Sequence, residues 1–442
     1  MNIAFICTEK LPSPAVKGGA IQMMIDGVLP FLSEKHKMTI FSVSDPSLPD
    51  VEEGENVTYI RAPRNKYVQH VAAKLAELPP FDVIHVFNRP KAVPAYKAAS
   101  PKSQFVLSLH NEMFAEHKLS DEEGQKAIDA VSAIMTVSHY IKGTIIHRFP
   151  EANDKIHVVY SGVDLAQFEP KWTEEGQRIS SRLKEKYGIS KHSKIILFIG
   201  RLSQTKGPHL LIQALPRILE THPDAVLVIC GGKWFSDNRL NDYVRMLHKL
   251  AKPLGDHVRF TKYIPHEEIP HSYLLGDVFV CSSQWQEPLA RVHYEAMAAG
   301  VPLITTKRGG NAEVITHMHN GLVLKNYNNP ANFSAAICDI FNHPDKAMEF
   351  SITGRKFVER NHQFIHVADR LEKVYLNAFE ELSSKLDQQV INDLEYRDEQ
   401  SEPPLEEEIH GMKEIEMPHT KKVKPIKFEP WVFDRTYPKR KR

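Results

Sequence analysis

Short hydrophobic runs recur along the first 160 residues, and longer stretches with hydrophobic residues at helical spacing separate them. Such uninterrupted runs are typical of strands buried on both faces of a parallel sheet. The stretch IQMMIDGVLPFL, residues 21–32, predicts an intervening helix. The alternation predicts βαβ units on a doubly wound sheet. The predicted strands are residues 3–7, 38–43, 83–87, 105–109, 133–137 and 155–160.

The pattern restarts after a turn-rich segment, YSGVDLAQFEPKW, residues 160–172. A second series of strands follows, at residues 194–200, 225–232, 258–263, 277–283 and 301–306. Two helical patterns, 345–361 and 366–386, then close the globular part without another strand. We therefore predict two Rossmann-like α/β domains that face a central cleft, residues 1–165 and 166–386. The final helices of the second domain are expected to return towards the first.

The last segment, residues 387–442, departs from both patterns. Residues 387–416 are rich in Asp and Glu, and residues 417–442 carry the basic clusters KKVK and PKRKR. Charged sequence with few hydrophobic residues predicts disorder. The alternative is a docking arm in which PWVF, residues 430–433, is an apolar anchor.

Composition narrows the class of protein. A chain of 442 residues is too long for a single ordinary core. Its net charge of +1 gives no reason to expect a nucleic acid partner. The four cysteines form no CxxC pair, which favours free thiols in a reducing compartment. With no basic hydrophobic leader and no apolar run near eighteen residues, we expect a cytoplasmic protein without a membrane span.

The first candidate for chemistry is a glycine pair, Gly18 and Gly19, immediately before the first predicted helix. Glycine lets the backbone approach an anion, and a helix N-terminus offers unpaired N–H groups to it. A glycine pair is also common in ordinary flexible loops, so alone it is a weak signal.

The segment GRLSQTKG, residues 200–207, follows a predicted strand at the end where open α/β sheets bind ligands. Arg201 and Lys206 flank this loop. A guanidinium gives planar contacts and an ammonium a point charge, so together they suit a diphosphate. As isolated surface charges they would carry no function.

Two carboxylates, Glu287 and Glu295, lie eight positions apart. Pro288 favours a loop conformation at Glu287, with a helix starting near Ala290 and Glu295 on its body. A carboxylate at Glu295 could accept two hydrogen bonds from a ribose diol, and Glu287 could meet another polyol. Glutamate pairs usually form a solvated helix face, but the neighbours AMAAGVPLI are small or apolar and argue against that here.

His110 ends the predicted strand 105–109 and could face the same cleft. The alternative is a hydrogen-bonded structural histidine. The sequence contains no HExxH motif and no Asp-x-Asp, so we predict no metal site.

Taken together, these motifs resemble the retaining, metal-independent glycosyltransferases of the GT-B fold, specifically glycosyltransferase family 4 (glycosyl transferases group 1). The resemblance covers about residues 1–385 and rests on the glycine pair, GVDLAQFEP, GRLSQTKG and E-x7-E followed by EAMAAGVPLITTKRGGNAE. The opening ICTEKLPSPAVKGGAIQ further resembles the spore-coat-associated glycosyltransferases of endospore-forming bacteria.

The resemblance implies a retaining hexosyltransferase that uses a nucleotide-sugar donor without a metal or other cofactor. It assigns the catalytic positions to His110, beside the anomeric centre, and Glu287, at the transferred sugar. It assigns the ribose to Glu295, and the diphosphate to Arg201 and Lys206. The backbone positions implied in donor binding are Gly18, Gly19, Tyr263, Ile264, Leu289, Ala290 and Arg291.

One position departs from the family pattern. Family members usually have Phe-Gly after Glu-Pro, whereas this chain has Leu289 and Ala290. The alanine methyl lies where the backbone approaches the sugar, which puts the preference for donor sugar and the activity in question.

Several assignments stay open. UDP is the expected nucleotide, with GDP and ADP as alternatives, and the acceptor can be a glycan, a lipid or a protein. Spore-coat proteins are candidate partners of the tail, residues 387–442, with a spore-coat location. The competing functions are a sugar-nucleotide epimerase or phosphorylase and a non-catalytic coat or assembly protein of the same fold.

Overall fold

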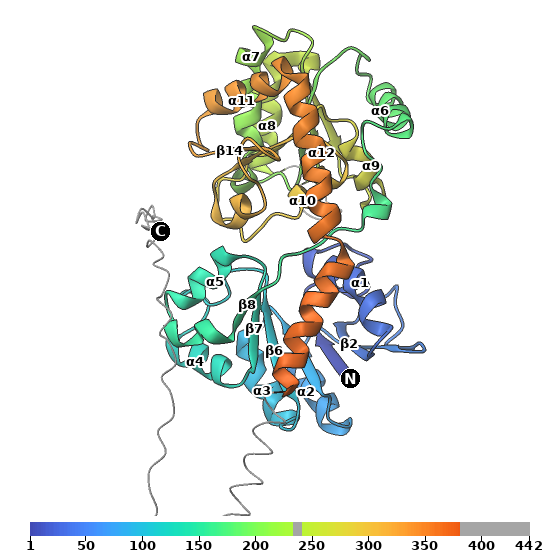
Figure 1. Ribbon diagram of the computed structural model, residues 1–442, viewed down its shortest axis with the longest axis vertical. Helices are drawn as coiled ribbons and strands as arrows, with labels where there is room; N and C mark the ends of the chain where they lie inside the picture. The colour runs from blue at the N-terminus through green and yellow to red at the C-terminus, as the bar shows by residue number, and fades with distance from the viewer. Residues whose placement is uncertain (233–240, 381–442) are drawn as a thin grey trace, which may run out of the picture. The chain divides into compact units, whose positions relative to one another are not determined.

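The structure is a computed structural model that describes residues 1–232 and 241–380. These residues fall within one compact unit and contain two sheets flanked by helices, the mixed α/β class expected (Figure 1). The predictions for residues 387–442, disorder or a docking arm, lie outside the described residues.

The N-terminal lobe is built on a sheet with strand order β3-β4-β2-β1-β5-β6-β7-β8. All neighbouring strands run parallel except β3, which pairs antiparallel with β4 at the edge. Every residue of β5 and β6 is buried because helices cover both faces of the sheet. The strands are β1 (Asn2–Ile6), β2 (Lys37–Val43), β3 (Val51–Glu53), β4 (Val57–Ala62), β5 (Val83–Phe87), β6 (Gln104–Leu109), β7 (Ala133–Thr136) and β8 (Ile156–Val158).

Two helices of this lobe, α4 and α5, begin where polar side chains satisfy their first N–H groups. Before α4, Ser120 and Glu123 form a capping box. Before α5, Ser138 Oγ accepts from Ile141 N. The helices are α1 (Ala20–Ser33), α2 (Tyr67–Glu77), α3 (Val93–Ala99), α4 (Asp121–Asp129) and α5 (His139–Ile146), with 3-10 turns η1 (Pro90–Ala92), η2 (Pro150–Lys155) and η3 (Leu165–Gln167).

The C-terminal lobe has a fully parallel sheet with strand order β11-β10-β9-β12-β13-β14. Its strands are β9 (Ile195–Ile199), β10 (Val226–Cys230), β11 (Val258–Lys262), β12 (Val278–Cys281), β13 (Leu303–Thr306) and β14 (Leu322–Leu324). Its helices are α6 (Glu174–Lys186), α7 (Pro208–Leu219), α8 (Asp242–Ala251), α9 (Ile269–Tyr273), α10 (Val292–Ala298), α11 (Pro330–Asn342) and α12 (Pro344–Asn361). The 3-10 turns are η4 (Gln204–Lys206), η5 (Lys252–His257), η6 (His266–Glu268) and η7 (Gly309–Glu313).

After α12 the chain returns to the N-terminal lobe as a helical segment, residues 364–380, coloured orange in Figure 1. Its buried side chains belong to the same hydrophobic core as β1 and β5. Tyr375 Oη lies 2.7 Å from Nδ1 of the fully buried His85. The chain passes between the lobes twice, near Val163 and near Gln363, and we call these two segments the crossings. They lie side by side, since Val163 pairs with Gln363 and Val163 N donates to His362 O at 2.8 Å.

Each predicted strand overlaps an observed one, whereas β3, β4 and β14 were not predicted. The helix expected near Ala290 begins at Val292, as α10. The exact division at residues 165 and 166 stays a prediction.

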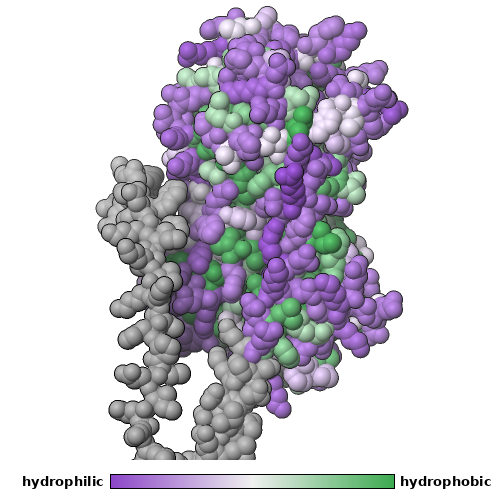
Figure 2. All heavy atoms as spheres, viewed as in Figure 1, coloured by the Kyte–Doolittle hydropathy of each residue, from purple (hydrophilic) through white to green (hydrophobic). Residues whose placement is uncertain are grey.

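On the face in Figure 2 most of the described surface is hydrophilic, with scattered hydrophobic patches. In the part of the chain that the structure describes, no helix combines the length and the apolar composition needed to cross a bilayer.

Candidate functional site

The loops that follow β9 and β12 are tied together at the carboxyl ends of these neighbouring strands. Gln284 N donates to Thr205 O at 2.7 Å, and Ser282 Oγ donates to Lys206 O at 2.9 Å. Gly207 has φ of 71°, and a Cβ there would lie 2.2 Å from Ser282 O. Glycine at this position therefore allows the loop that carries Lys206 to lie directly on the second loop.

Lys206 and Glu287, both predicted as site residues, form an ion pair at this junction, with Glu287 buried and Lys206 partly buried. Lys206 Nζ donates to the two Glu287 carboxylate oxygens at 2.9 and 2.8 Å. Ser283 Oγ and Trp285 Nε1 also donate to Glu287 Oε2, at 2.9 and 2.6 Å. Burial alone would raise the pKa of Glu287, but the Lys206 charge and these hydrogen bonds outweigh it and lower the pKa below its usual value.

The sequence predicted that Arg201 and Lys206 bind a diphosphate, and the structure adds that Lys206 already has a partner, Glu287. Lys206 is neutralised in part by Glu287, so an arriving diphosphate would meet a fixed cation–anion pair instead of a bare ammonium. Arg201 lies two residues beyond the end of β9, on the same loop as Lys206. Ser283 and Trp285 were missed by sequence reasoning, although a tryptophan in the polar segment QWQEP was a usable signal.

The backbone of η7 packs directly against the segment that carries Glu287. Gly310 N donates to Glu287 O at 2.8 Å, and Gly309 N donates to Gln286 Oε1 at 2.7 Å. Gly309 has φ of 54°, and a Cβ there would lie 2.0 Å from Glu287 O. Only glycine can hold this close approach, which explains the second glycine pair of the motif.

Glu295 lies on α10 and is 9% exposed. Its Oε2 accepts from the buried Tyr273 Oη at 2.9 Å, and its Oε1 lies 3.7 Å from Arg291 Nε. One oxygen is thus held by a phenol while the other faces a guanidinium. The carboxylate keeps lone pairs free to accept further hydrogen bonds, and its contact with a ribose diol stays a prediction.

The Arg291 side chain joins the lobes. Its Nη1 donates to Ser161 Oγ at 3.0 Å and to Gly162 O at 3.1 Å, in the segment that links the two sheets. Burial, and after it the positive charge of Arg291, lower the pKa of His110 to about 4. His110 is therefore neutral at pH 7.

His110 follows β6 directly. Its backbone N–H donates to Asn88 Oδ1 at 2.8 Å, while its ring Nε2 is buried without a hydrogen-bond partner. A structural histidine would normally have both ring nitrogens satisfied. His85, His222 and His293 also have a buried ring nitrogen without a partner, so this feature does not distinguish the two alternatives, and the role of His110 stays a prediction.

Gly18 and Gly19 lie at the start of α1, with φ of 69° and 111°. A Cβ added at Gly18 would have no other atom within 4 Å, whereas a Cβ added at Gly19 would lie 2.6 Å from Gln22 Oε1. Gly18 is thus the open position of the pair, and at Gly19 the positive φ favours glycine.

The remaining predicted positions are dispersed around the C-terminal lobe. Ala290 is 7% exposed, and its N–H donates to Asn311 Oδ1 at 3.3 Å, with partly buried Leu289 before it. Tyr263 and Ile264 follow β11, where Tyr263 is 36% exposed and Ile264 is buried.

A cavity of about 390 Å³ lies between α1, the linker and the start of α9. Glu295 and Arg291 line it, together with Asp26, His266 and Phe364. The other predicted side chains of the site, His110, Arg201, Lys206 and Glu287, do not line this cavity. Of the predicted site, Glu295 and Arg291 therefore reach this cavity. Among the described residues no group of three or more His, Cys, Asp or Glu side chains is arranged to hold a metal ion.

Comparison with known protein families gives two matches. The model described as Glycosyl transferases group 1 matches residues 180–357, and the model described as Glycosyltransferase Family 4 matches residues 27–167. The first match contains the Lys206–Glu287 pair and Glu295.

Two proteins of Bacillus subtilis (strain 168) are similar over most of their length. The putative glycosyltransferase YtcC is 56% identical over 375 residues, which is 85% of this chain and 92% of YtcC. Spore coat protein SA is 48% identical over 375 residues, which is 85% of this chain and 99% of that protein.

Solved structures share the fold. The crystal structure of Anabaena Alr3699/HepE in complex with UDP superposes with a TM-score of 0.69 at 20% identity, over 85% of this chain and 100% of that one. Sucrose-phosphate synthase from Thermosynechococcus elongatus gives a TM-score of 0.69 at 20% identity, over 86% of this chain and 99% of that one. This likeness shows the GT-B architecture of two α/β lobes.

Proposed function

Since this chain belongs to the glycosyltransferases of family 4, the glycosyl transferases group 1, we propose that it transfers a sugar from a nucleotide-sugar donor to an acceptor, with retention at the anomeric carbon and without a metal. The observation that carries this proposal is the Lys206–Glu287 pair at the ends of β9 and β12. The pair fixes the Lys206 ammonium at the strand ends, on the loop that also carries Arg201, where the two cations together can face a diphosphate leaving group.

The chemistry assigned to the site is charge stabilisation. The bond between the sugar C1 and the diphosphate oxygen breaks, and Arg201 and Lys206 stabilise the negative charge that develops on that oxygen. Glu287 orients Lys206 and contacts the transferred sugar. His110, neutral at pH 7, would lie beside the sugar as an uncharged group.

Retention follows in this proposal from attack on the same face as departure. The acceptor oxygen bonds to C1 as the diphosphate leaves, and its proton passes to the leaving phosphate oxygen. The only carboxylate of the predicted set near the sugar, Glu287, already accepts from Lys206, Ser283 and Trp285. A carboxylate held in this way is a poor nucleophile, which favours the same-face route over a double displacement.

We assign the donor to the UDP-sugars first. The Anabaena structures contain UDP, UDP and glucose, or UDP-glucose, and that chemistry is proposed here by analogy of fold alone. Glu295 would hold the ribose hydroxyls. The acceptor is a glycan, a lipid or a protein.

The test is isothermal titration of the full-length chain with UDP, GDP and ADP in EDTA, beside Arg201→Ala. We expect one nucleotide to bind without metal, with affinity reduced about 10²-fold in the variant. NMR of the anomeric proton of the product then decides the stereochemistry. A folded protein that binds none of the three nucleotides, or an inverted product, contradicts the proposal.

A second candidate function is a coat or assembly role, favoured by the 48% identity to spore coat protein SA. In that role the protein would be located at the spore coat, with coat proteins bound through residues 387–442, and otherwise in the cytoplasm. A chain shortened to residues 1–386 distinguishes the roles, because a scaffold would lose its location while an enzyme would keep its turnover.

A further inference from the structure

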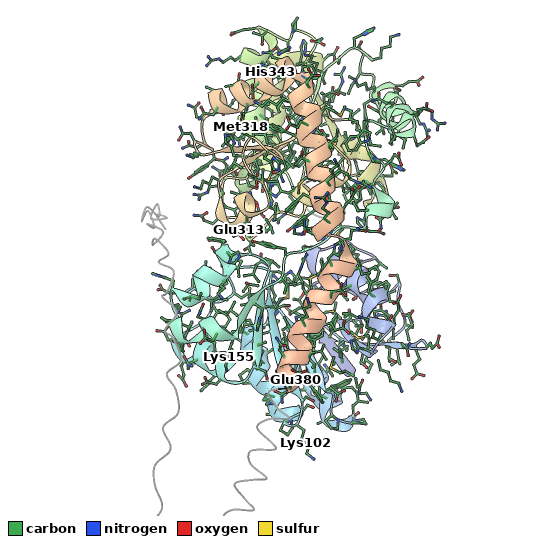
Figure 3. All side chains as sticks on the ribbon, in the orientation of Figure 1. Lys102, Lys155, Glu313, Met318, His343 and Glu380 are labelled. Atoms are coloured by element: carbon green, nitrogen blue, oxygen red, sulfur yellow. The ribbon has the colours of Figure 1, made fainter. Side chains whose placement is uncertain are left out.

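A single carboxylate, Glu313, bridges the two lobes. It ends η7 in the C-terminal lobe, and Figure 3 labels it beside the segment between the two sheets. Its oxygens accept from the backbone N–H groups of His139 and Tyr140, both at 2.7 Å, at the start of α5 in the N-terminal lobe. Tyr160 Oη donates a third hydrogen bond at 2.9 Å.

This arrangement completes a helix cap with groups from both lobes. The first N–H groups of a helix have no partner within the helix. Ser138 Oγ satisfies the third one, that of Ile141, and Glu313 satisfies the first two. The negative charge also faces the positive end of the helix dipole. The cap of α5 is therefore complete only while the lobes are together.

The same turn holds the candidate donor site. Gly310 N donates to Glu287 O, and Asn311 Oδ1 accepts from Ala290 N. A Cβ at Gly310 would lie 2.2 Å from Pro288 O and 2.9 Å from Ser138 Cβ, so the turn is packed between donor segment and helix cap. The turn η7 thus connects the Glu313 contact on α5 to the backbone around Glu287.

We propose that Glu313 is a positioning residue: by docking on the N-terminus of α5 it holds the segment Glu287–Arg291 against the strand ends of the N-terminal lobe, where His110 lies. The contact rests on geometry alone, and its effect on turnover rests on the proposed function. The donor would bind the C-terminal lobe whether or not Glu313 is docked on α5, and docking would keep the donor segment next to the strand ends that carry His110.

Hydrogen exchange of the full-length chain tests the contact. Gln at position 313 offers one acceptor oxygen for two N–H groups, so we expect Glu313→Gln to speed exchange in peptides containing His139 and Tyr140 about tenfold, together with the Glu287–Arg291 peptide. Glu123→Gln is the matched control, since Glu123 caps α4 within a single lobe. It should speed exchange only near Ser120. Unchanged exchange at His139 and Tyr140, or a change confined to them, overturns the proposal.

A second measurement separates positioning from general loss of structure. With UDP and UDP-glucose as probes, Glu313→Gln should leave the Kd for UDP within about threefold and lower the turnover of UDP-glucose about tenfold. Tyr160→Phe, which removes one of three hydrogen bonds, should have a smaller effect in the same direction. An equal loss of binding and turnover, or none in either, contradicts positioning. If the wild-type chain binds no nucleotide, the proposed function fails while the exchange experiment still decides the contact.

Discussion

At the scale of single residues, the decisive contact is the ammonium of Lys206 on the carboxylate of Glu287. Breaking a buried pair from one side leaves a charge without compensation. We expect Lys206→Met to lower the free energy of unfolding by about 3 kcal/mol, because Ser283 and Trp285 alone must then solvate the Glu287 charge. Urea unfolding at pH 7 measures the change.

The control for this variant is Lys126→Met, which breaks the exposed pair of Lys126 with Glu122 on α4. Water solvates both groups there, so no measurable change is expected. Adding Glu287→Gln to Lys206→Met should restore part of the lost stability, since a neutral amide still accepts from Ser283. A Lys206 variant as stable as the control would show that the buried charge is solvated in another way.

At the scale of elements, η7 depends on backbone that only glycine allows. We expect Gly309→Ala to destabilise the chain by at least about 3 kcal/mol and to weaken nucleotide binding, because the new Cβ would collide with Glu287 O. Gly188→Ala is the matched control, because Gly188 also has a positive φ, of 64°, but an added Cβ there would have no atom within 4 Å. It should cost about 1 kcal/mol and leave binding unchanged. Equal effects of the two variants in unfolding and titration would contradict a role for the close approach.

Elements also show where sequence reasoning succeeds. The buried strands were predicted because a parallel sheet covered on both faces requires continuous hydrophobic runs. The edge strand β3 was missed because its three residues are all exposed and leave no such run. β14 was missed because it too has only three residues.

Side-chain partners across the site were less predictable. Glu287 and Lys206 were each identified as candidates, yet the two residues are 81 positions apart in sequence and their loops meet only in the fold. The sequence likewise placed Arg291 at the donor by its backbone, whereas its side chain binds the linker at Ser161. Glu313 carried no signal beyond its place in GGNAE, because its partners are backbone N–H groups of another lobe.

At the scale of the whole molecule, four buried histidines govern the response to acid. Burial is the main cause that lowers the pKa of His85 to about 3 and that of His110, His293 and His362 to about 4. In the unfolded chain each would take up a proton near pH 6.5. The unfolded state thus binds more protons between about pH 6.5 and pH 4, and stability falls as pH falls through this window.

We expect unfolding at pH 5.5 to take up about four protons beyond those taken up at pH 8, with a slope of stability on pH of about 1.4 kcal/mol per unit for each fully titrating histidine. Calorimetry measures the unfolding enthalpy in two buffers with different heats of ionisation. The difference between the two enthalpies gives the number of protons taken up on unfolding. Proton uptake near zero at pH 5.5 would mean that these rings are already charged in the folded chain.

The paired crossings of the chain, at Val163 and Gln363, have a consequence for exchanging parts between relatives. The N-terminal lobe is discontinuous in sequence, since residues 364–380 complete its core. The C-terminal lobe is therefore inserted within the sequence of the N-terminal lobe, and the two ends of the insertion lie side by side. A chimaera that joins two relatives at one point near residue 165 would give the first lobe a foreign closing helix. A chimaera with two junctions, at the two crossings, would keep each core with its own side chains.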